Sequence, residues 1–324
     1  MITLAKKLIT CSGTTKKLEV NGYVEFVSST PMKITPTYTN SGVTLRYSLD
    51  GITWTPIVSG ITTPSANIIY FIGRASGTKS LYASSSNINA WAFTGATNLE
   101  CNGKLDRLLQ DDLGGDSDIL TIGANCFSYM FYNVTKLIKA PILPATILAN
   151  YCYRYMFGSC TSLTSAPALP ATILANYCYD NMFTGCTSLT SAPALPAMTL
   201  ATECYNGMFV GCTGLTVAPA LPAMTLANYC YYNMFLNCSN LTILPALPAM
   251  TLANYCYNGI FRGCTKIKVS TTLTGIYDTA YRIPTSGTGT TTANSLTSVF
   301  YQTGGTFTGT PDINTTYYIE NTPV

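Results

Sequence analysis

The sequence predicts an α+β solenoid preceded by a small N-terminal β module, and three observations support this prediction. Residues 126–274 consist of a 26-residue segment that repeats without slippage. Each copy combines an apolar pattern typical of a short helix with a short extended segment rich in Leu and Pro. The residues before about position 88 instead alternate between apolar and polar. A strict period of this length indicates a solenoid, in which each unit buries its apolar face only against its neighbours.

The N-terminal residues 1–88 are predicted to form a separate β-sandwich-like module. Residues 32–38 alternate clearly between apolar and polar, and residues 68–73 read as a buried strand. Between them, Asp50-Gly51 separates two strand-like runs and is a strong signal for a hairpin turn. Several short strands with turns between them favour a small sandwich.

Residues 89–125 are predicted to form an N-terminal capping repeat with a charged insertion. The repeat motif occurs once here, from Phe93 to Leu99, with Ala96 at the cysteine position. Four aspartates of the insertion surround Gly114-Gly115, namely Asp111, Asp112, Asp116 and Asp118. They could bind calcium, but their spacing matches an EF-hand loop poorly. We therefore favour a solvated surface of the cap.

The six units of the predicted solenoid span residues 126–278, and each is expected to hold one short helix and one short strand. Leu174, Cys178 and Met182 lie four residues apart, which gives one apolar face of two to three helical turns. Gly185 follows and can adopt the left-handed conformation that ends helices. Leu189 then begins an extended segment whose two prolines limit it to a brief strand or a bend.

Residues 279–324 are predicted to form a C-terminal cap and a β tail. Val299-Phe300 repeats the pattern of Ile260-Phe261, as expected of an atypical terminal unit. Residues 284–294 have the composition of a flexible loop, and residues 315–319 read as a final strand.

Eleven of the 13 cysteines fall in two repeat columns. The first column is Cys126, Cys152, Cys178, Cys204, Cys230 and Cys256, and the second is Cys160, Cys186, Cys212, Cys238 and Cys264. Val134 takes the second position in the first unit, so this column suits a small apolar core residue. We predict buried free thiols. The odd count disfavours the alternative of a disulfide framework, and the absence of histidine together with the spacing of eight disfavours metal binding.

Composition excludes several functional classes. Charged residues make up only 10% of the chain and the net charge is +3, which disfavours binding to nucleic acid. No apolar run is long enough to span a membrane, and the N-terminus does not resemble a secretory signal. Without histidine the common catalytic triads cannot form. We therefore expect no enzymatic activity and no cofactor.

The variable columns of the repeat are the candidate recognition surface, because fixed columns hold the fold while variable ones are free to differ. The candidate residues are Arg154, Asp180, Asn206, Tyr232 and Asn258 in one column, and Thr184, Val210, Leu236 and Arg262 in another. Two further columns are rich in tyrosine. We expect one to be a half-buried stacked ladder, whereas the other, if exposed beside Asn and Thr, would suit recognition of sugar or protein.

The repeat resembles the leucine-rich repeats of BspA-like bacterial surface proteins. The motif of that family is Phe-x-x-Cys-x-x-Leu, which occurs here as Phe157-Gly-Ser-Cys160-Thr-Ser-Leu163 and again from Phe183 to Leu189. The resemblance covers about half of the chain, and the extra Pro-Ala-Leu-Pro segment departs from the family pattern. It implies a leucine-rich-repeat solenoid that binds through a repetitive surface.

Two functions fit these features. The first is a non-enzymatic virion protein, such as a tail fibre or baseplate component of a bacteriophage or prophage, made in the host cytoplasm. A β module followed by repeats also resembles phage tail-associated repeat proteins. Its expected partners are a host-cell surface glycan or protein and, through the N-terminal module, other virion proteins, with a possible homo-oligomer. The second is a secreted or cell-surface BspA-like adhesin, and neighbouring tail and lysis genes would favour the first.

Overall fold

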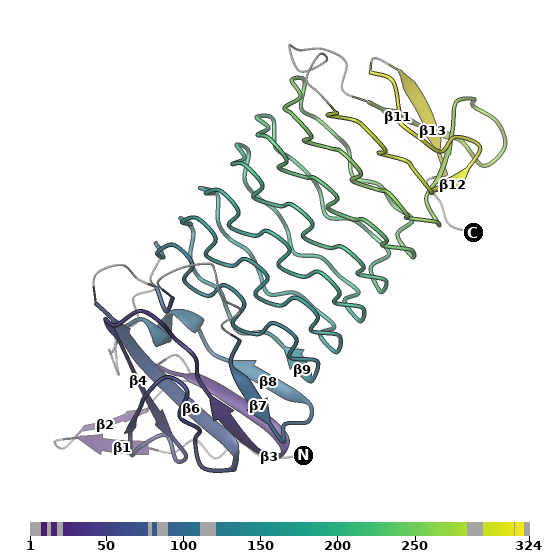
Figure 1. Ribbon diagram of the computed structural model, residues 1–324. Coiled ribbons are helices and arrows are strands. Elements are labelled where there is room, and N and C mark those ends of the chain that lie inside the picture. Colours follow the sequence, from purple (N-terminus) through teal and green to yellow (C-terminus); the bar gives the residue numbers. More distant parts are fainter. Residues whose placement is uncertain are drawn as a thin grey trace.

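A sheet, a stack of coils and a second small sheet follow one another along the elongated molecule (Figure 1). The structure is a computed structural model that describes residues 8–11, 14–17, 22–76, 80–82, 90–110, 121–283, 294–313 and 315–320. The predicted acidic cluster at residues 111–118 and most of the predicted loop at 284–294 lie outside these residues.

The N-terminal part forms one large sheet and one hairpin. The strands are β1 Leu8–Cys11, β2 Thr14–Lys17, β3 Val24–Thr35, β4 Val43–Ser48, β5 Thr55–Ile57, β6 Ala66–Ala75, β7 Ala92–Thr94, β8 Leu99–Asn102 and β9 Leu137–Lys139. β1 pairs with β2, while the large sheet has the order β5-β4-β6-β3-β8-β9, with β7 paired to β3. The predicted sandwich is therefore wrong, because strands β3 to β9 join a single sheet.

The hairpin predicted at Asp50-Gly51 is confirmed. β4 and β5 pair antiparallel on either side of it, with Leu45 opposite Ile57. The Asp50 carboxylate accepts hydrogen bonds from the backbone N–H groups of Ile52 and Thr53, both at 2.8 Å. These bonds to its ionised form lower the pKa of Asp50.

The large sheet continues directly into the repeats. Its last strand, β9, belongs to the first repeat and pairs in parallel with β8. The Trp91 N–H donates to the Met130 carbonyl at 2.9 Å. The rings of Phe93 and Phe131 stack with centroids 5.9 Å apart. The short 3-10 helix η1, Leu105–Leu108, is buried at this junction. Thus one continuous core joins the sheet to the solenoid.

Each repeat contains a run of consecutive turns in place of the predicted helix. We call each run a rung and the stack of rungs the turn ladder. The rungs are residues 124–133, 150–159, 176–185, 202–211, 228–237 and 254–263. In one rung the N–H of Met156 donates within the repeat to Tyr153, whereas the N–H of Phe157 donates to Met182 of the next repeat. Such alternation continues along each rung. The predicted α+β solenoid with a helix in every unit is therefore wrong.

The turn ladder resembles a helix in sequence because it also buries residues four apart. Two adjacent side chains point inward and the next two outward, so Cys152 and Tyr153 are buried, as are Met156 and Phe157. A left-handed residue recurs at every fourth position, however, with φ of 61° at Tyr151. Such residues interrupt a right-handed helix, since L-amino acids adopt this conformation singly. Gly185 is left-handed as predicted, with φ of 72°, but it is the third such residue of its rung.

The extended half of each repeat is less regular than the predicted strand. Between repeats it forms isolated parallel bridges, such as Ser165 with Ser191 and Val217 with Ile243. Two prolines per segment lack the N–H that a continuous ladder needs. Leu169 and Ala171 nevertheless point inward and close the core.

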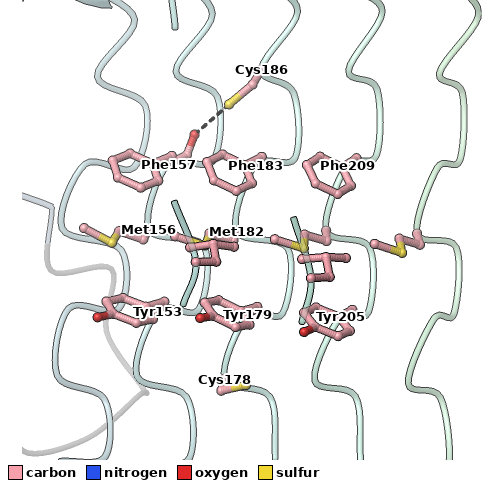
Figure 2. Close-up of a cluster of buried hydrophobic side chains, with 14 of the residues drawn as sticks. Tyr153, Met156, Phe157, Cys178, Tyr179, Met182, Phe183, Cys186, Tyr205 and Phe209 are labelled. Carbon is pink, nitrogen blue, oxygen red and sulfur yellow. Dashed lines mark hydrogen bonds between the residues drawn. The ribbon is translucent and has the colours of Figure 1, made fainter. Parts of the chain in front are cut away.

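The core consists of ladders of identical side chains (Figure 2). Phe157 and Phe183 stack with centroids 5.5 Å apart and ring planes 6° from parallel. The buried tyrosines Tyr179 and Tyr205 stack at 5.7 Å. Met182 lies between the phenylalanine and tyrosine columns (Figure 2). Because every rung presents the same shape to the next, the core can extend without a change in packing.

The predicted burial of the cysteine columns is confirmed. The second-column cysteines, from Cys160 to Cys264, are fully buried, and the twelve cysteines whose side chains the structure describes are free. Each thiol of this column donates to the carbonyl of a phenylalanine one repeat earlier, as Cys186 does to Phe157 at 3.1 Å. Burial raises the pKa of the Cys186 thiol to about 12. These cysteines are therefore core residues with a backbone partner.

A four-stranded sheet covers the C-terminal end of the solenoid. Its strands are β10 Lys268–Ser270, β11 Thr279–Arg282, β12 Gly304–Gly305 and β13 Thr316–Ile319, in the order β11-β13-β10-β12. β13 confirms the predicted final strand. Residues 294–302 form one more rung of turns, in which Phe300 stacks on Phe261 at 6.1 Å.

Candidate recognition surface

The outward positions of the turn ladder form parallel columns of side chains, one residue per repeat. Adjacent rungs are joined by backbone hydrogen bonds, so equivalent side chains lie about 5 Å apart. Both predicted variable columns occupy outward positions. The first runs from Arg154 to Asn258, and the second includes Thr184 and Arg262. The structure thus brings the predicted recognition residues onto one face.

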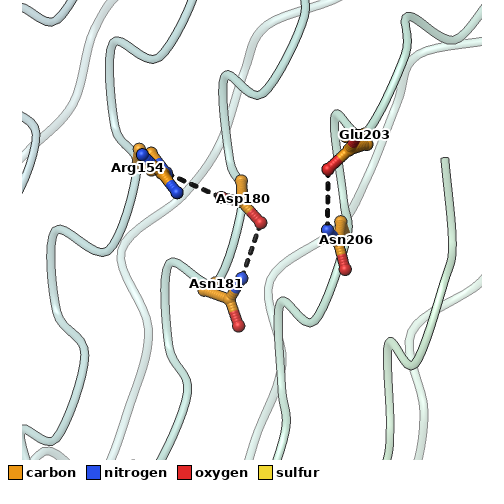
Figure 3. A network of polar contacts seen from close by, with 5 residues as sticks. All are labelled: Arg154, Asp180, Asn181, Glu203 and Asn206. Atoms are coloured by element: carbon orange, nitrogen blue, oxygen red, sulfur yellow. Dashed lines mark hydrogen bonds and ion pairs between the residues drawn. The ribbon is translucent and has the colours of Figure 1, made fainter. Parts of the chain in front are cut away.

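Two charged residues dominate the N-terminal half of the first column (Figure 3). Nε of Arg154 donates to the Asp180 carboxylate at 2.8 Å, and Asn181 donates to the same carboxylate. Asp180 is only 2% exposed, although its position is outward. Burial raises its pKa to about 6, against the opposing effect of Arg154. Asp180 therefore contacts Arg154 of the neighbouring rung and is not a freely exposed recognition group.

The guanidinium of Arg154 also lies among aromatic rings. Its carbon is 6.0 Å from the ring centroid of Tyr129, 5.6 Å from that of Tyr151 and 5.4 Å from that of Tyr155. These distances fall within the range of cation–π attraction. This part of the face therefore holds a cation between tyrosines and a carboxylate.

Polar and aromatic groups make up the C-terminal half of the first column. Asn206 donates from its amide to Glu203 at 3.0 Å (Figure 3). The Tyr232 ring is half-buried and meets Tyr229 edge-on at 5.6 Å. Asn258 donates to the carbonyl of Asn294 in the terminal rung at 3.2 Å. Tyr232 is the aromatic side chain of this column, and it is half-exposed.

The second column is more apolar. Val210 and Leu236 are half-buried, while Thr184 donates to the Val210 carbonyl at 3.5 Å. Arg262 is exposed, and its guanidinium carbon lies 5.2 Å from the Tyr301 ring centroid. The two columns together combine apolar, aromatic and hydrogen-bonding groups on one strip.

A third column is one of the two tyrosine-rich columns of the sequence, and its backbone is unusual for this residue type. Tyr151, Tyr177, Tyr229 and Tyr255 are half-exposed and have φ between 55° and 61°. Their rings stack in two pairs, each with centroids 4.6 Å apart. The tyrosine column two residues further on, including Tyr153, is buried in the core. The recurring Tyr-x-Tyr pattern signals both columns, but the sequence does not say which one faces solvent.

Asparagines flank the exposed tyrosines. The side-chain Oδ1 of Asn150 accepts from the backbone N–H of Asn176 at 3.1 Å, and Oδ1 of Asn228 accepts likewise from the backbone N–H of Asn254 at 3.2 Å. These side chains are exposed, and they satisfy backbone donors that the turn ladder leaves open at its edge. The exposed strip thus presents amides beside phenol groups.

An apolar line marks the corner between the extended segment and the turn ladder. One large exposed side chain stands there in each of five successive repeats. They are Ile147 at 37% exposure, Ile173 at 57%, Met198 at 51%, Met224 at 48% and Met250 at 38%. The surface therefore has an apolar line as well as the polar and aromatic strip.

No cluster of three potential metal ligands occurs among the residues that the structure describes. In the same part of the chain no helix is long and apolar enough to cross a bilayer. Comparisons of the chain with protein-family models, with curated proteins and with solved structures give no significant match.

Proposed function

We propose that this chain is a non-enzymatic binding protein that attaches to a host-cell surface through the outward face of its turn ladder. The proposed setting is an exposed fibre of a bacteriophage or prophage virion. A bacterial surface adhesin would use the same face. The observation that carries the proposal is the column of half-exposed tyrosines at left-handed backbone positions.

Tyrosine is an unfavourable choice at such positions. A non-glycine residue held in the left-handed region costs of order 1–3 kcal/mol. The next left-handed column of the same rungs begins with Tyr155 and continues with Asn181, Gly207, Asn233 and Gly259, and the Asn and Gly residues relieve this cost. Tyrosine is nevertheless present in four of the five rungs between Tyr151 and Tyr255. Because backbone strain at a surface needs a compensating role, we infer that these rings serve recognition.

The chemistry of the face also suits binding. Phenol hydroxyls and asparagine amides can both donate and accept hydrogen bonds, while the ring edges supply apolar contact. Tyrosine and asparagine are common in binding surfaces that must combine rigidity with adaptable hydrogen bonding. Few charges lie on the strip, so the contacts made by its phenol and amide groups should depend weakly on salt.

The proposal is tested by attachment of single-site variants to target cells. Tyr232→Ala should weaken binding at least tenfold, since a central aromatic residue often contributes about 2 kcal/mol or more. Its melting curve should stay close to that of the wild type because the ring is half-exposed.

The matched control is a change on the N-terminal sheet. Val58→Ser replaces a side chain that is 66% exposed and directly follows β5, the strand at the opposite edge of the large sheet from β9. It should leave attachment unchanged. If Val58→Ser abolishes attachment while Tyr232→Ala binds like the wild type, recognition belongs to the N-terminal part and the proposal is wrong.

The virion setting has its own test. An antibody against the chain should label phage particles induced from the source strain, at discrete points of the tail. Label on the intact bacterial surface, with unlabelled particles, would instead identify the adhesin.

A further inference from the structure

The column of exposed tyrosines has a single interruption, at Glu203. Tyr151 stacks on Tyr177 on the N-terminal side of the interruption, and Tyr229 stacks on Tyr255 on its C-terminal side. Glu203 occupies the same left-handed position, with φ of 54°. At the interruption, each ring pair therefore faces Glu203 in place of a further tyrosine.

Backbone hydrogen bonds place Glu203 directly between the two ring pairs. The Tyr177 N–H donates to the Thr202 carbonyl, and the Glu203 N–H donates to the Asn228 carbonyl, at 3.0 and 3.1 Å. The rungs of Tyr177 and Tyr229 are thus two rungs apart. At about 4.8 Å per rung, their ring planes stand roughly 10 Å apart. A cation midway between them would lie about 5 Å from each ring, within the range of cation–π attraction.

The carboxylate of Glu203 is positioned by neutral groups. Asn206 donates to it at 3.0 Å, and a hydrogen bond with Glu203 is the main cause that raises the pKa of Tyr177 to about 12. Its negative charge also contributes to the raised pKa of Tyr229, after burial and the neighbouring Tyr255. No ion pair to Glu203 occurs within the described part of the chain. A charged carboxylate therefore stands between two aromatic rings without a cationic partner.

The same face already contains a filled arrangement of this kind. Arg154 lies over Tyr129, Tyr151 and Tyr155, and the Asp180 carboxylate neutralises its charge. Rings and a carboxylate of the turn ladder are therefore able to hold an organic cation. The arrangement around Glu203 is built differently. Its carboxylate lies in the tyrosine column itself, between the rungs of Tyr177 and Tyr229, and the position of Arg154 is taken by the neutral Asn206.

We propose that the interruption at Glu203 is a binding site for an organic ammonium group, with Tyr177 and Tyr229 as aromatic walls and Glu203 as the counter-ion. The inference rests on the proposed function, because it assigns the class of ligand that the turn-ladder face takes from a cell surface. A quaternary or primary ammonium group of a surface polymer has this chemistry.

Titration calorimetry with choline tests the site on the full chain. The neutral isostere 3,3-dimethylbutan-1-ol should bind at least tenfold more weakly than choline, since it has the same shape without the charge. Butylamine and propylguanidine separate a quaternary ammonium from a primary ammonium and a guanidinium. Equal binding of choline and its neutral isostere would overturn the proposal.

Two substitutions of Glu203 complete the test. Glu203→Gln keeps the shape and removes the charge, so choline affinity should fall at least tenfold. Glu203→Tyr completes the tyrosine column and fills the gap, using the residue that four of the equivalent rungs already have. It should keep the fold, judged by an unchanged melting curve, and abolish choline binding. Wild-type affinity in both variants would contradict the proposed site.

Cell attachment separates this inference from the proposed function. If the wild type does not bind choline while Tyr232→Ala still impairs attachment, the ammonium site is wrong and the proposed function stands. If Glu203→Tyr abolishes choline binding but neither it nor Tyr232→Ala alters attachment, the site stands and the proposed function is wrong.

Discussion

Nε of Arg154 donates to the carboxylate of Asp180 at 2.8 Å, although the two residues are 26 positions apart in the sequence. They occupy the same column in adjacent rungs. Opposite charges pair in this column, whereas the core columns stack identical side chains. Arg154 is 28% exposed, whereas the Asp180 side chain is almost fully buried. The pair therefore lies at the boundary between core and surface, where burial raises the pKa of Asp180 to about 6.

This raised pKa predicts a pH-dependent contribution to stability. A carboxyl group with a folded-state pKa of about 6 and an ordinary unfolded value near 4 binds its proton more tightly when folded. The contribution of Asp180 to the free energy of unfolding should therefore rise as pH falls from 7 to 4.5. We expect a change on the order of 1–2 kcal/mol, measured by urea denaturation against Asp180→Asn, which cannot titrate.

Asp50 provides a contrast within the same protein. Because its pKa is lowered, its contribution to the free energy of unfolding decreases as pH falls, and it does so at lower pH than the change expected for Asp180. Its contribution is unchanged by Asp180→Asn and cancels in the difference between the two proteins. An identical pH dependence of the wild type and Asp180→Asn would refute the prediction.

Gly207→Ala distinguishes the turn ladder from a helix. In a helix interior, Ala is about 1 kcal/mol more favourable than Gly. Here Gly207 has φ of 57°, and an added Cβ would approach the Asn181 side-chain oxygen. The substitution should therefore destabilise the protein by about 1–2 kcal/mol, as seen in chemical denaturation.

Asn233→Gly in the same column is the matched control. Asn233 has φ of 51°, a conformation that glycine adopts without strain. Stability should stay within about 0.5 kcal/mol of the wild type, because no strain is added. A more stable Gly207→Ala protein would restore the helical interpretation.

The buried thiols should be unreactive in the folded protein. At pH 8 the second-column cysteines are protonated and inaccessible, since burial raises the pKa of Cys186 and Cys238 to about 12. An alkylating reagent without reductant should label them only after denaturation, which mass spectrometry can follow. Cysteines that stay unlabelled in denaturant until reductant is added would indicate disulfides instead.

Cys186→Ala tests the thiol as a core group. It removes a buried sulfur and its hydrogen bond to the Phe157 carbonyl, so we expect a loss of about 1–2 kcal/mol. Cys186→Ser keeps a donor at the same place. If both variants lose the same stability, the hydrogen bond contributes nothing beyond packing.

The phenylalanine column should dominate the stability of the solenoid. Phe235 is fully buried and stacks on Phe209 at 5.6 Å and on Phe261 at 5.9 Å. Phe235→Ala leaves a cavity between two rungs and should cost roughly 3–5 kcal/mol. Thermal denaturation beside Tyr232→Ala provides the comparison, because that ring is half-exposed and its loss should be small. Equal losses in the two variants would contradict the assigned core.

The sequence by itself determined the period of the repeat and the burial of its cysteine columns. The 26-residue period places Phe157 over Phe183 and Cys160 over Cys186 in any stacked arrangement. The alternating pattern and Asp50-Gly51 likewise predicted the β4–β5 hairpin. These features are local or strictly periodic, so composition and spacing are sufficient to reveal them.

Only the tertiary structure decided the backbone conformation of the repeat and which of its outward side chains are exposed. A helix and the turn ladder bury the same residues at spacings of four, so the apolar pattern cannot distinguish them. The difference lies in hydrogen bonds such as that from Tyr153 to Cys178, which join consecutive rungs. The same inter-rung contacts bury Asp180 and expose Tyr177. Because their partners are 25 or more residues away, a local sequence pattern does not predict them.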